Sequence, residues 1–360
     1  MKVLIVAFHS RSMTPYSKQY EDVINELNIK YDIVFWDRFT NGKLEKNKNE
    51  YIIHKKCSLG GGKIKKIFPM IYFRNTVKKI INNNKYDRII VLNTLPAVLL
   101  KKTLIKNFFN NYILDIRDYT YEKYNFYKKI VDDLVENSFY TNISSKGFLV
   151  FLKENSKIHI GHNISNNDEM YYSDNIQKKK KINIGFVGVV RYEKENQYLL
   201  NAIKNDDRFE CIYVGRSYPD CNLEQYCINE NIENVSFEGE FNNKDKKNIY
   251  KNIDVINAIY GNNSLEVQTA LPNKLYDAII FKKPMIVSKK TYLAKIVEKY
   301  KLGIAVDLGE DIKLKLEEYI NSFDSNSFDE NANRLLKIVN EDQMKIEIKI
   351  KEFLRTYRNR

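Results

Sequence analysis

Two stretches of the sequence carry the residues best suited to bind a phosphate group. In the first, a strand-like apolar run, 182–187, ends at Gly188, and Arg191 and Lys194 follow within the first turn of a predicted helix. A glycine lets a ligand approach the backbone, an arginine offers bidentate hydrogen bonds, and a lysine supplies a point charge. Together they could neutralise a diphosphate leaving group. The alternative is an ordinary helix whose first turn carries surface charges.

The second stretch covers residues 271–288. Pro272 precedes a predicted helix and presets its first turn, so that free N–H groups from Asn273 and Lys274 onwards could meet a phosphate. Asp277 follows one turn later, where its carboxylate could accept hydrogen bonds from ribose hydroxyls. The alternative for Asp277 is a solvated helix residue near the positive end of the helix dipole. The predicted donor-binding residues are Gly188, Arg191, Lys194, Asn273, Lys274 and Asp277.

A third candidate, Asp118, comes just after the strand-like run 112–115. It is the carboxylate best placed to act as a general base toward an acceptor hydroxyl. An aspartate in this position is equally typical of a helix N-cap, and Arg117 could be its structural partner. His9 also ends a strand-like run, but a lone histidine there is more often a hydrogen-bonded loop residue. The predicted catalytic residues are Asp118, Arg191 and Lys194.

Alternating strand and helix patterns run along the chain and restart near its middle, which predicts two α/β domains with parallel sheets. We expect an N-terminal acceptor domain over 1–163 and a polar linker over 164–181. A C-terminal donor domain is expected over 182–340, followed by a helix over 341–360 that packs back on the first domain. The expected fold is two Rossmann-like domains that face each other across a cleft.

The positive charge is confined to the first part of the chain. The net charge is +13, and residues 1–160 contain 28 Lys and Arg against 15 Asp and Glu, whereas residues 161–360 contain 31 of each. Such a field favours an anionic partner, and compositional bias is the alternative explanation. The stretch 63–74 mixes basic and aromatic residues, which is typical of a helix on an anionic membrane or of an amphipathic helix with solvated lysines.

No apolar run is long enough for a signal peptide or a membrane span, so we expect a cytoplasmic protein that could lie on the inner face of the cell membrane. The four cysteines show no CxxC spacing, which argues against a zinc site or a disulfide framework. No nucleic-acid-binding motif occurs, so we expect no nucleic-acid partner.

The two stretches 182–194 and 271–288 resemble the donor domain of GT-B glycosyltransferases of the family 4, or group 1, type. Gly188, Arg191 and Lys194 resemble the family's strand, glycine, arginine and lysine. Asp277 and Pro284 resemble a glutamate seven residues before a proline that opens a buried strand. The segment 113–118 resembles an Asp-x-Arg/His-Asp/Glu motif of the first domain, and Asn163 resembles an asparagine at that domain's end.

The resemblance implies transfer of a sugar from a nucleoside-diphosphate sugar to a hydroxyl acceptor, and it favours retention of anomeric configuration by front-face attack. An inverting enzyme would instead need a base, for which Asp118 is the best carboxylate candidate. The resemblance also implies an acceptor that is lipid-linked or part of a surface polysaccharide, such as a capsule or a lipopolysaccharide. No Asp-x-Asp triplet occurs in the sequence, so we expect Arg191 and Lys194 to replace a divalent metal and expect no cofactor.

Two departures from the family pattern keep alternatives open. The first of the family's two glutamates would fall on Thr269, with Glu266 as a substitute if the loop shifts, and a glycine-rich loop after the first strand is missing. A catalytically degenerate scaffold of a polysaccharide assembly complex therefore stays possible, as does an enzyme like the sugar-nucleotide 2-epimerases.

Overall fold

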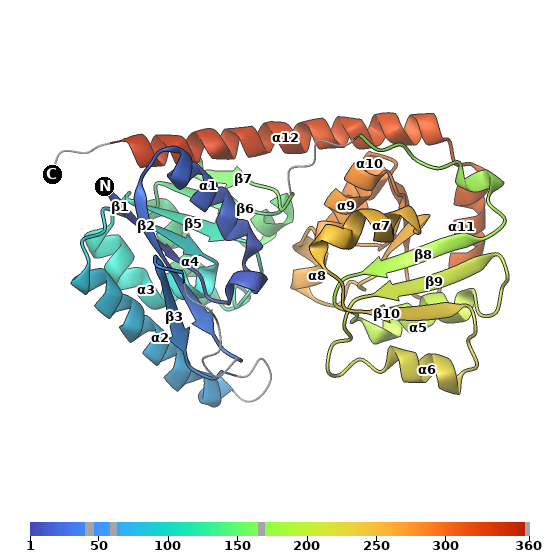
Figure 1. Ribbon diagram of the computed structural model, residues 1–360, viewed down its shortest axis with the longest axis horizontal. Coiled ribbons are helices and arrows are strands. Elements are labelled where there is room, and N and C mark those ends of the chain that lie inside the picture. Colours follow the sequence, from blue (N-terminus) through green and yellow to red (C-terminus); the bar gives the residue numbers. More distant parts are fainter. Residues whose placement is uncertain (40–46, 58–62, 165–169, 357–360) are drawn as a thin grey trace. The chain divides into compact units, whose positions relative to one another are not determined.

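The computed structural model describes residues 1–39, 47–57, 63–164 and 170–356 and divides into two units. Unit 1 comprises Met1–His162 together with Glu341–Arg360, and unit 2 comprises Asn163–Asn340. Each unit contains one parallel β-sheet with helices on its faces (Figure 1). The expected α/β class is therefore confirmed.

Unit 1 has a seven-stranded sheet in the order β3-β2-β1-β4-β5-β6-β7. The strands are β1 Lys2–Val6, β2 Lys30–Asp37, β3 Glu50–His54, β4 Arg88–Leu92, β5 Tyr112–Ile116, β6 Tyr140–Ile143 and β7 Ile158–Ile160. The helices are α1 Lys18–Glu26, α2 Lys63–Asn83, α3 Thr94–Asn107 and α4 Asn125–Asn137. Every residue of β4 and β5 is buried, which explains why these strands read as continuous apolar runs.

Unit 2 has a six-stranded sheet in the order β10-β9-β8-β11-β12-β13. The strands are β8 Ile182–Val187, β9 Phe209–Val214, β10 Val235–Gly239, β11 Val255–Ala258, β12 Met285–Ser288 and β13 Gly303–Val306. The helices are α5 Glu193–Ala202, α6 Leu223–Asn229, α7 Lys246–Lys251, α8 Leu265–Thr269, α9 Asn273–Phe281, α10 Tyr292–Lys299 and α11 Ile312–Asn321. In Figure 1, α7, α9 and α10 lie on one side of this sheet and α5 and α6 on the other.

Both sheets reverse their strand order at one point, between β1 and β4 in unit 1 and between β8 and β11 in unit 2. The loops that leave the two strands at such a point turn to opposite faces of the sheet. A crevice therefore opens beyond the carboxyl ends of the strands, where open α/β sheets bind their ligands. The candidate residues must be judged by whether they lie at these two places.

The last helix, α12 (Ser325–Arg355), contributes to both hydrophobic cores. Phe328, Ala332, Leu335 and Val339 belong to the core of unit 2. Further along, Ile346, Ile350, Phe353 and Leu354 pack in the core of unit 1 beside Val3, Tyr20 and Tyr140. Within each group successive residues are three or four positions apart, except for the adjacent pair Phe353 and Leu354. This is the spacing of one apolar stripe along a helix.

The segment expected as a linker, 164–181, differs from that expectation in its described part. Ile176 is 1% exposed in the core of unit 2, and the Ser173 backbone N–H donates to both carboxylate oxygens of Asp329 (3.1 and 3.2 Å). The Ser173 hydroxyl also donates to the Ser325 carbonyl (3.1 Å). The polar composition that suggested a linker therefore serves hydrogen bonds to α12. Residues 165–169 of the expected linker and 357–360 of the expected C-terminal helix lie outside the described residues.

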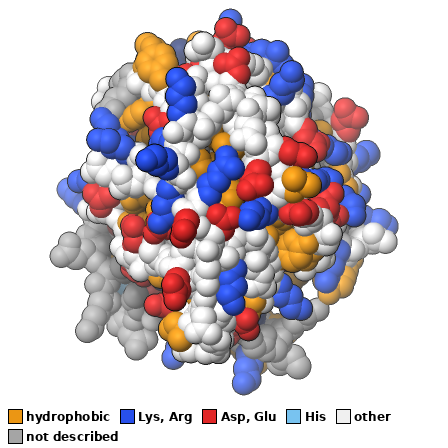
Figure 2. All heavy atoms as spheres, turned by 90° about the vertical axis from the view of Figure 1, so that its right-hand side faces the viewer, with side chains coloured by type: hydrophobic (Ala, Val, Ile, Leu, Met, Phe, Trp, Pro, Cys, Tyr) orange, Lys and Arg blue, Asp and Glu red, His pale blue; other side chains and the backbone are white. Residues whose placement is uncertain are grey.

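Charge is balanced on the part of unit 2 that can be seen in Figure 2. Basic and acidic side chains alternate over this face, in agreement with the equal numbers of both in residues 161–360. The excess of positive charge therefore belongs to unit 1.

Candidate functional site

The carboxyl end of β8 is open where a ligand could reach the backbone. Gly188 has φ +128°, and a Cβ built on it would meet no atom within 4 Å. Its N–H donates to the Val214 carbonyl of β9 (2.8 Å), and a Cβ on the neighbouring Gly215 would lie 1.9 Å from the Gly188 carbonyl oxygen. The two strand ends thus pack backbone against backbone, which requires glycine at Gly215.

The loop after Gly188 is held by a buried asparagine that the sequence analysis did not identify. The Asn196 amide donates to the carbonyls of Arg191 (3.0 Å) and Tyr192 (2.9 Å), and its oxygen accepts from the Tyr213 hydroxyl (3.0 Å). Tyr192 has a left-handed conformation (φ 65°, ψ 52°) just before α5. This anchoring leaves the Arg191 guanidinium exposed, 4.8 Å above the Tyr192 ring centre.

Lys194 is exposed and takes part in no ion pair within the described ranges. Two carboxylates, Glu193 and Glu195, share the first turn of α5 with it. They already compensate the partial positive charge of that helix end and oppose a second anion there. The positive charge available to a ligand at this loop therefore comes from side chains rather than from the α5 terminus.

Helix α9 offers the better anion site. Its first turn contains no acidic residue, and Pro272 occupies its N-cap. Exposed Asn273 accepts a hydrogen bond on Oδ1 from Nδ2 of Asn163 (2.5 Å). Gly188 and Arg191 thus follow β8, and the Lys274 side chain extends from the first turn of α9 to Tyr260, which follows β11.

Lys274 is a buried lysine. Its side chain is enclosed at 5% residue exposure, its Nζ donates to the Tyr260 hydroxyl (3.0 Å), and the Nζ lies 3.1 Å from the Phe186 ring centre. No carboxylate in the described part of the chain lies within salt-bridge distance of it. Burial holds the pKa of Lys274 well below its ordinary value, and the positive charge of Arg191 adds to this shift.

Two stacked tyrosines cover this lysine at the point where the strand order reverses. The rings of Tyr192, after β8, and Tyr260, after β11, lie 4.7 Å apart at 28°. Because the Tyr260 hydroxyl is also the acceptor for Lys274, one chain of contacts links Arg191, Tyr192, Tyr260 and Lys274. The aromatic members of this chain belong to no motif, and their sequence positions alone gave no signal for them.

Asp277 is directed toward α7 instead of standing free. It is 8% exposed, and it accepts from the Lys246 ammonium on both oxygens (2.9 and 3.0 Å) and from the Tyr250 hydroxyl on Oδ2 (2.8 Å). A carboxylate has about four lone-pair sites, so about one is left, on Oδ1. Asp277 therefore joins α7 to α9, and its predicted ribose contact is limited to that one oxygen. The alternative of a solvated helix residue is wrong.

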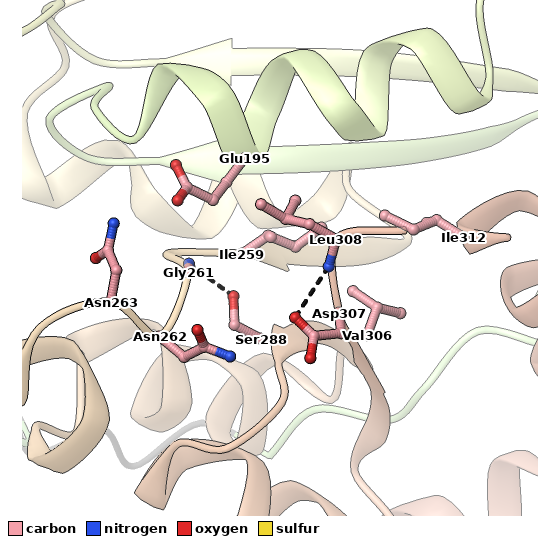
Figure 3. A pocket seen from close by; sticks show the side chains of 10 residues that line it. All are labelled: Glu195, Ile259, Gly261, Asn262, Asn263, Ser288, Val306, Asp307, Leu308 and Ile312. Carbon is pink, nitrogen blue, oxygen red and sulfur yellow. Dashed lines mark hydrogen bonds between the residues drawn. The ribbon is translucent and has the colours of Figure 1, made fainter. Parts of the chain in front are cut away.

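A small pocket lies beyond the carboxyl ends of β11, β12 and β13 (Figure 3). Glu195 points into it from α5, and a Cβ on Gly261 would lie 2.5 Å from Glu195 Oε1. The Ser288 hydroxyl oxygen accepts from the N–H groups of Gly261 (2.8 Å) and Tyr260 (3.0 Å). A volume of about 80 Å³ has room for several water molecules or one small group, but not for a nucleotide.

In unit 1, Arg117 pairs with Asp115 and not with Asp118. Its guanidinium donates to both oxygens of Asp115 (2.7 and 3.0 Å) and to the Gly161 carbonyl (3.1 Å). Burial lowers the pKa of Arg117, but the Asp115 carboxylate outweighs this and raises it above its ordinary value. The expectation that Arg117 could be the structural partner of Asp118 is therefore replaced by a buried pair that closes β5.

Asp118 is exposed, and its Oδ2 lies 3.5 Å from Nδ2 of Asn93, at the end of β4. The next helix, α4, starts only at Asn125 with Tyr124 as its N-cap, so the alternative role of Asp118 as a helix N-cap is wrong. His9 lies after β1, where burial and the charge of Arg38 lower its pKa to about 4. His9 is therefore neutral at physiological pH.

Comparisons with known proteins identify the family of unit 2 and the fold of the chain. The family described as "Glycosyl transferases group 1" matches residues 170–336, which lie within unit 2. Unit 2 is a group 1 glycosyltransferase domain. A comparison of this glycosyltransferase with the curated proteins found no match.

Solved structures extend the likeness to the whole chain. Sucrose-phosphate synthase from Thermosynechococcus elongatus aligns with a TM-score of 0.75 at 12% identity, covering 98% of this chain and 99% of that one. Anabaena HepE in complex with UDP and glucose gives 0.68 at 15% identity, with 98% and 99% covered. WaaG, a glycosyltransferase involved in lipopolysaccharide biosynthesis, gives 0.65 at 11% identity, with 99% and 100% covered. The fold of this glycosyltransferase is GT-B.

The depressed pKa of Lys274 predicts how the stability of unit 2 changes with pH. Because the unfolded chain holds a proton on Lys274 that the folded chain lacks, the free energy of unfolding should rise with pH from the depressed pKa up to about 10.4. Lys274→Met should remove this rise and should be at least as stable as wild type at pH 7. Differential scanning calorimetry of wild type and variant from pH 7 to pH 10 measures this pH dependence of the free energy of unfolding.

Lys299→Met is the matched control, since Lys299 is exposed and lies 5.2 Å from the Tyr300 ring centre. This variant should follow wild type at every pH. A Lys274→Met variant with the wild-type pH dependence would show that Lys274 is charged in the folded protein.

Proposed function

We propose that this glycosyltransferase takes a sugar from a nucleoside-diphosphate sugar, held mainly by unit 2, and transfers it to a hydroxyl acceptor. The observation that carries the proposal is the enclosed Lys274 ammonium, which has no carboxylate partner in the described ranges and lies in the first turn of α9. An anion placed there would meet the lysine, the free N–H groups of the helix and Arg191 at once. The Anabaena HepE structures, which contain UDP or UDP-glucose, support a ligand of this class.

The chemistry asked of the site is stabilisation of the departing nucleoside diphosphate. The bond from the anomeric carbon to the phosphate oxygen breaks with negative charge developing on that oxygen, and preorganised cations lower the energy of this state. Arg191, Lys194 and Lys274 are the cations that we assign to it. With three cations and a helix terminus supplying positive charge, we propose that transfer needs no divalent ion.

On the acceptor side we propose Asp118 as the group that takes the proton. As the acceptor oxygen bonds to the anomeric carbon, its proton passes to the Asp118 carboxylate while the nucleoside diphosphate leaves with the bonding electrons. We propose retention of configuration, by attack on the same face from which the diphosphate leaves. No protein nucleophile is required for this course.

The donor site predicts a selective response to nucleotides. At about a hundred times Kd, the matching nucleoside diphosphate should stabilise the protein by roughly 2.7 kcal/mol, and chelation of magnesium should not change this. Lys274→Met should lose the stabilisation, whereas Lys299→Met should keep it. A thermal-shift panel of UDP, GDP, ADP and dTDP, with and without EDTA, is the measurement.

The panel also separates the alternatives. The absence of any shift would contradict the proposed function. The protein could also bind a nucleotide but fail to release it from the corresponding sugar nucleotides when acceptor extracts are present. This result would favour the degenerate scaffold. Thr269, at the position of the family's first glutamate, is the feature of the sequence that supports this alternative. In the structure the Thr269 hydroxyl donates to the Leu265 carbonyl (2.6 Å), so it does not do the work of a carboxylate.

For the acceptor we propose a glycan or lipid-linked glycan at an anionic membrane, reached through α2. Four neighbouring residues of this helix leave an apolar face exposed: Ile67 (49%), Phe68 (74%), Ile71 (38%) and Tyr72 (47%). Phe73, Val77 and Ile80 on the other side are buried, so the helix is already anchored to its sheet by a separate face. Lys65 and Lys79 are exposed on the same helix, and the Lys55 ammonium lies 5.2 Å from the Tyr72 ring centre. No helix in the described ranges is long and apolar enough to cross a membrane.

Membrane binding by this face can be tested with vesicles. Full-length protein should sediment with vesicles that contain phosphatidylglycerol, less with pure phosphatidylcholine and less in high salt. Phe68→Ser with Ile71→Ser should weaken binding at least roughly tenfold through the lost apolar burial. Phe126→Ser, a change of a 67% exposed residue on α4, is the control. Equal binding of the double variant and wild type would refute the role of α2.

A further inference from the structure

Asn93, between β4 and α3, has a strained backbone. Its φ of 78° and ψ of 159° fall in a region that essentially only glycine occupies. The other described non-glycine residues with positive φ lie between 50° and 65°, in the ordinary left-handed range. A conformation of this kind persists only where the surroundings enforce it, and such residues cluster at functional sites.

The contacts of Asn93 explain what enforces it. Its N–H donates to the Asp115 carbonyl of β5 (2.6 Å), and its side-chain oxygen accepts from the Arg117 N–H (3.1 Å). The carboxamide is thereby fastened to the exit of the neighbouring strand. Asn93 is 7% exposed, so its two amide hydrogens need nearby acceptors.

These amide hydrogens point to two groups from different loops. Nδ2 donates to the Tyr16 hydroxyl oxygen (3.2 Å) and lies 3.5 Å from Oδ2 of Asp118. Tyr16 belongs to the segment that follows β1, in the 3₁₀ turn Pro15–Ser17, whereas Asp118 follows β5. Asn93 itself ends β4, so the three residues meet where the strand order of unit 1 reverses.

We propose that Asn93 is a positioning residue of the acceptor side, which uses its strained backbone to hold the Asp118 carboxylate beside the Tyr16 hydroxyl. The proposal rests on the proposed function, in which Asp118 receives the acceptor proton. An amide donor favours the charged carboxylate, the form that can accept a proton. Tyr16 stays a neutral hydrogen-bond donor, because burial and the charges of Asp115 and Asp118 raise its pKa.

Charged and titratable groups near Asp118 include Tyr16 from the segment after β1 and the buried Asp115–Arg117 pair from β5. Arg117 lies 5.1 Å from the Tyr16 ring centre and is neutralised by Asp115. Raised pKa values keep Tyr16 neutral, through its burial, and Arg117 charged, through the Asp115 carboxylate.

Asn93→Gly separates strain from function, because glycine accepts the backbone conformation and lacks the amide. We expect this variant to unfold at the same or higher urea concentration, followed by the fluorescence of Trp36, the one tryptophan of the chain, which is buried in unit 1. We expect kcat for transfer to fall roughly tenfold and KM for the donor to stay unchanged. The acid limb of the pH profile of kcat/KM for the acceptor should move to higher pH.

Two further variants complete the test. Asn28→Gly changes an exposed asparagine with φ 53° and should leave kcat and the pH profile unchanged. Asn93→Asp keeps an acceptor for the Arg117 N–H but places a second carboxylate near Asp118, so it should move the acid limb further in the same direction. Asn93→Gly or Asn93→Asp with the wild-type kcat and pH profile would overturn the positioning role. The acid limb of the pH profile should differ between wild type and Asp118→Asn. The same acid limb in both would instead contradict the proposed function.

Discussion

The proposed donor site depends on a lysine that aromatic rings enclose and beside which no carboxylate lies within the described ranges. Lys274 lies between Phe186 and Tyr260 in the first turn of α9, and its burial costs free energy that a salt bridge would otherwise offset. A core lysine that served stability alone would be replaced to advantage by methionine. We propose that Lys274 lies at the carboxyl edge of a parallel sheet, near exposed Arg191, to bind an anionic ligand.

Unit 1 also contains an energetically unfavourable feature at the reversal of its strand order, but of a different kind. There the buried charge, Arg117, is fully paired with Asp115, and the unfavourable element is the backbone of Asn93. In both units the polar groups come from loops that leave neighbouring strands at the reversal of strand order, so the topology explains how residues about a hundred positions apart, such as Tyr16 and Asp118, meet. The reversal of strand order in each sheet brings these loops together, and no sequence motif is needed for this.

The sequence predicted the elements best where a strand is buried on both faces and bounded by a turn. Residues 182–187 were predicted as a strand and form β8, because an apolar run followed by glycine leaves few alternatives. Strand β7 has no fully buried residue, and β3 is only partly buried, so neither gave a comparable signal. At the candidate sites, Gly188, Arg191 and Lys274 were predicted from spacing, and their roles stay predictions. The partners Tyr192, Tyr260, Asn196 and Asn93 were not predicted, because their roles depend on contacts between loops. The pairing of Asp277 with Lys246, 31 residues earlier, likewise follows from the packing of α7 on α9 and not from either residue's neighbours.

The most direct test of a donor site centred on Lys274 is the number of protons taken up when a nucleoside diphosphate binds. A diphosphate beside the ammonium should return the pKa of Lys274 toward its ordinary value, so binding should take up protons at a pH between the two values. Calorimetric titration with the nucleotide that stabilises the protein, in two buffers of different ionisation enthalpy, measures this number. We expect an uptake of up to about one proton for wild type and Lys299→Met, and a clearly smaller uptake, with weaker binding, for Lys274→Met. The same affinity and the same proton uptake for Lys274→Met and wild type would contradict the account.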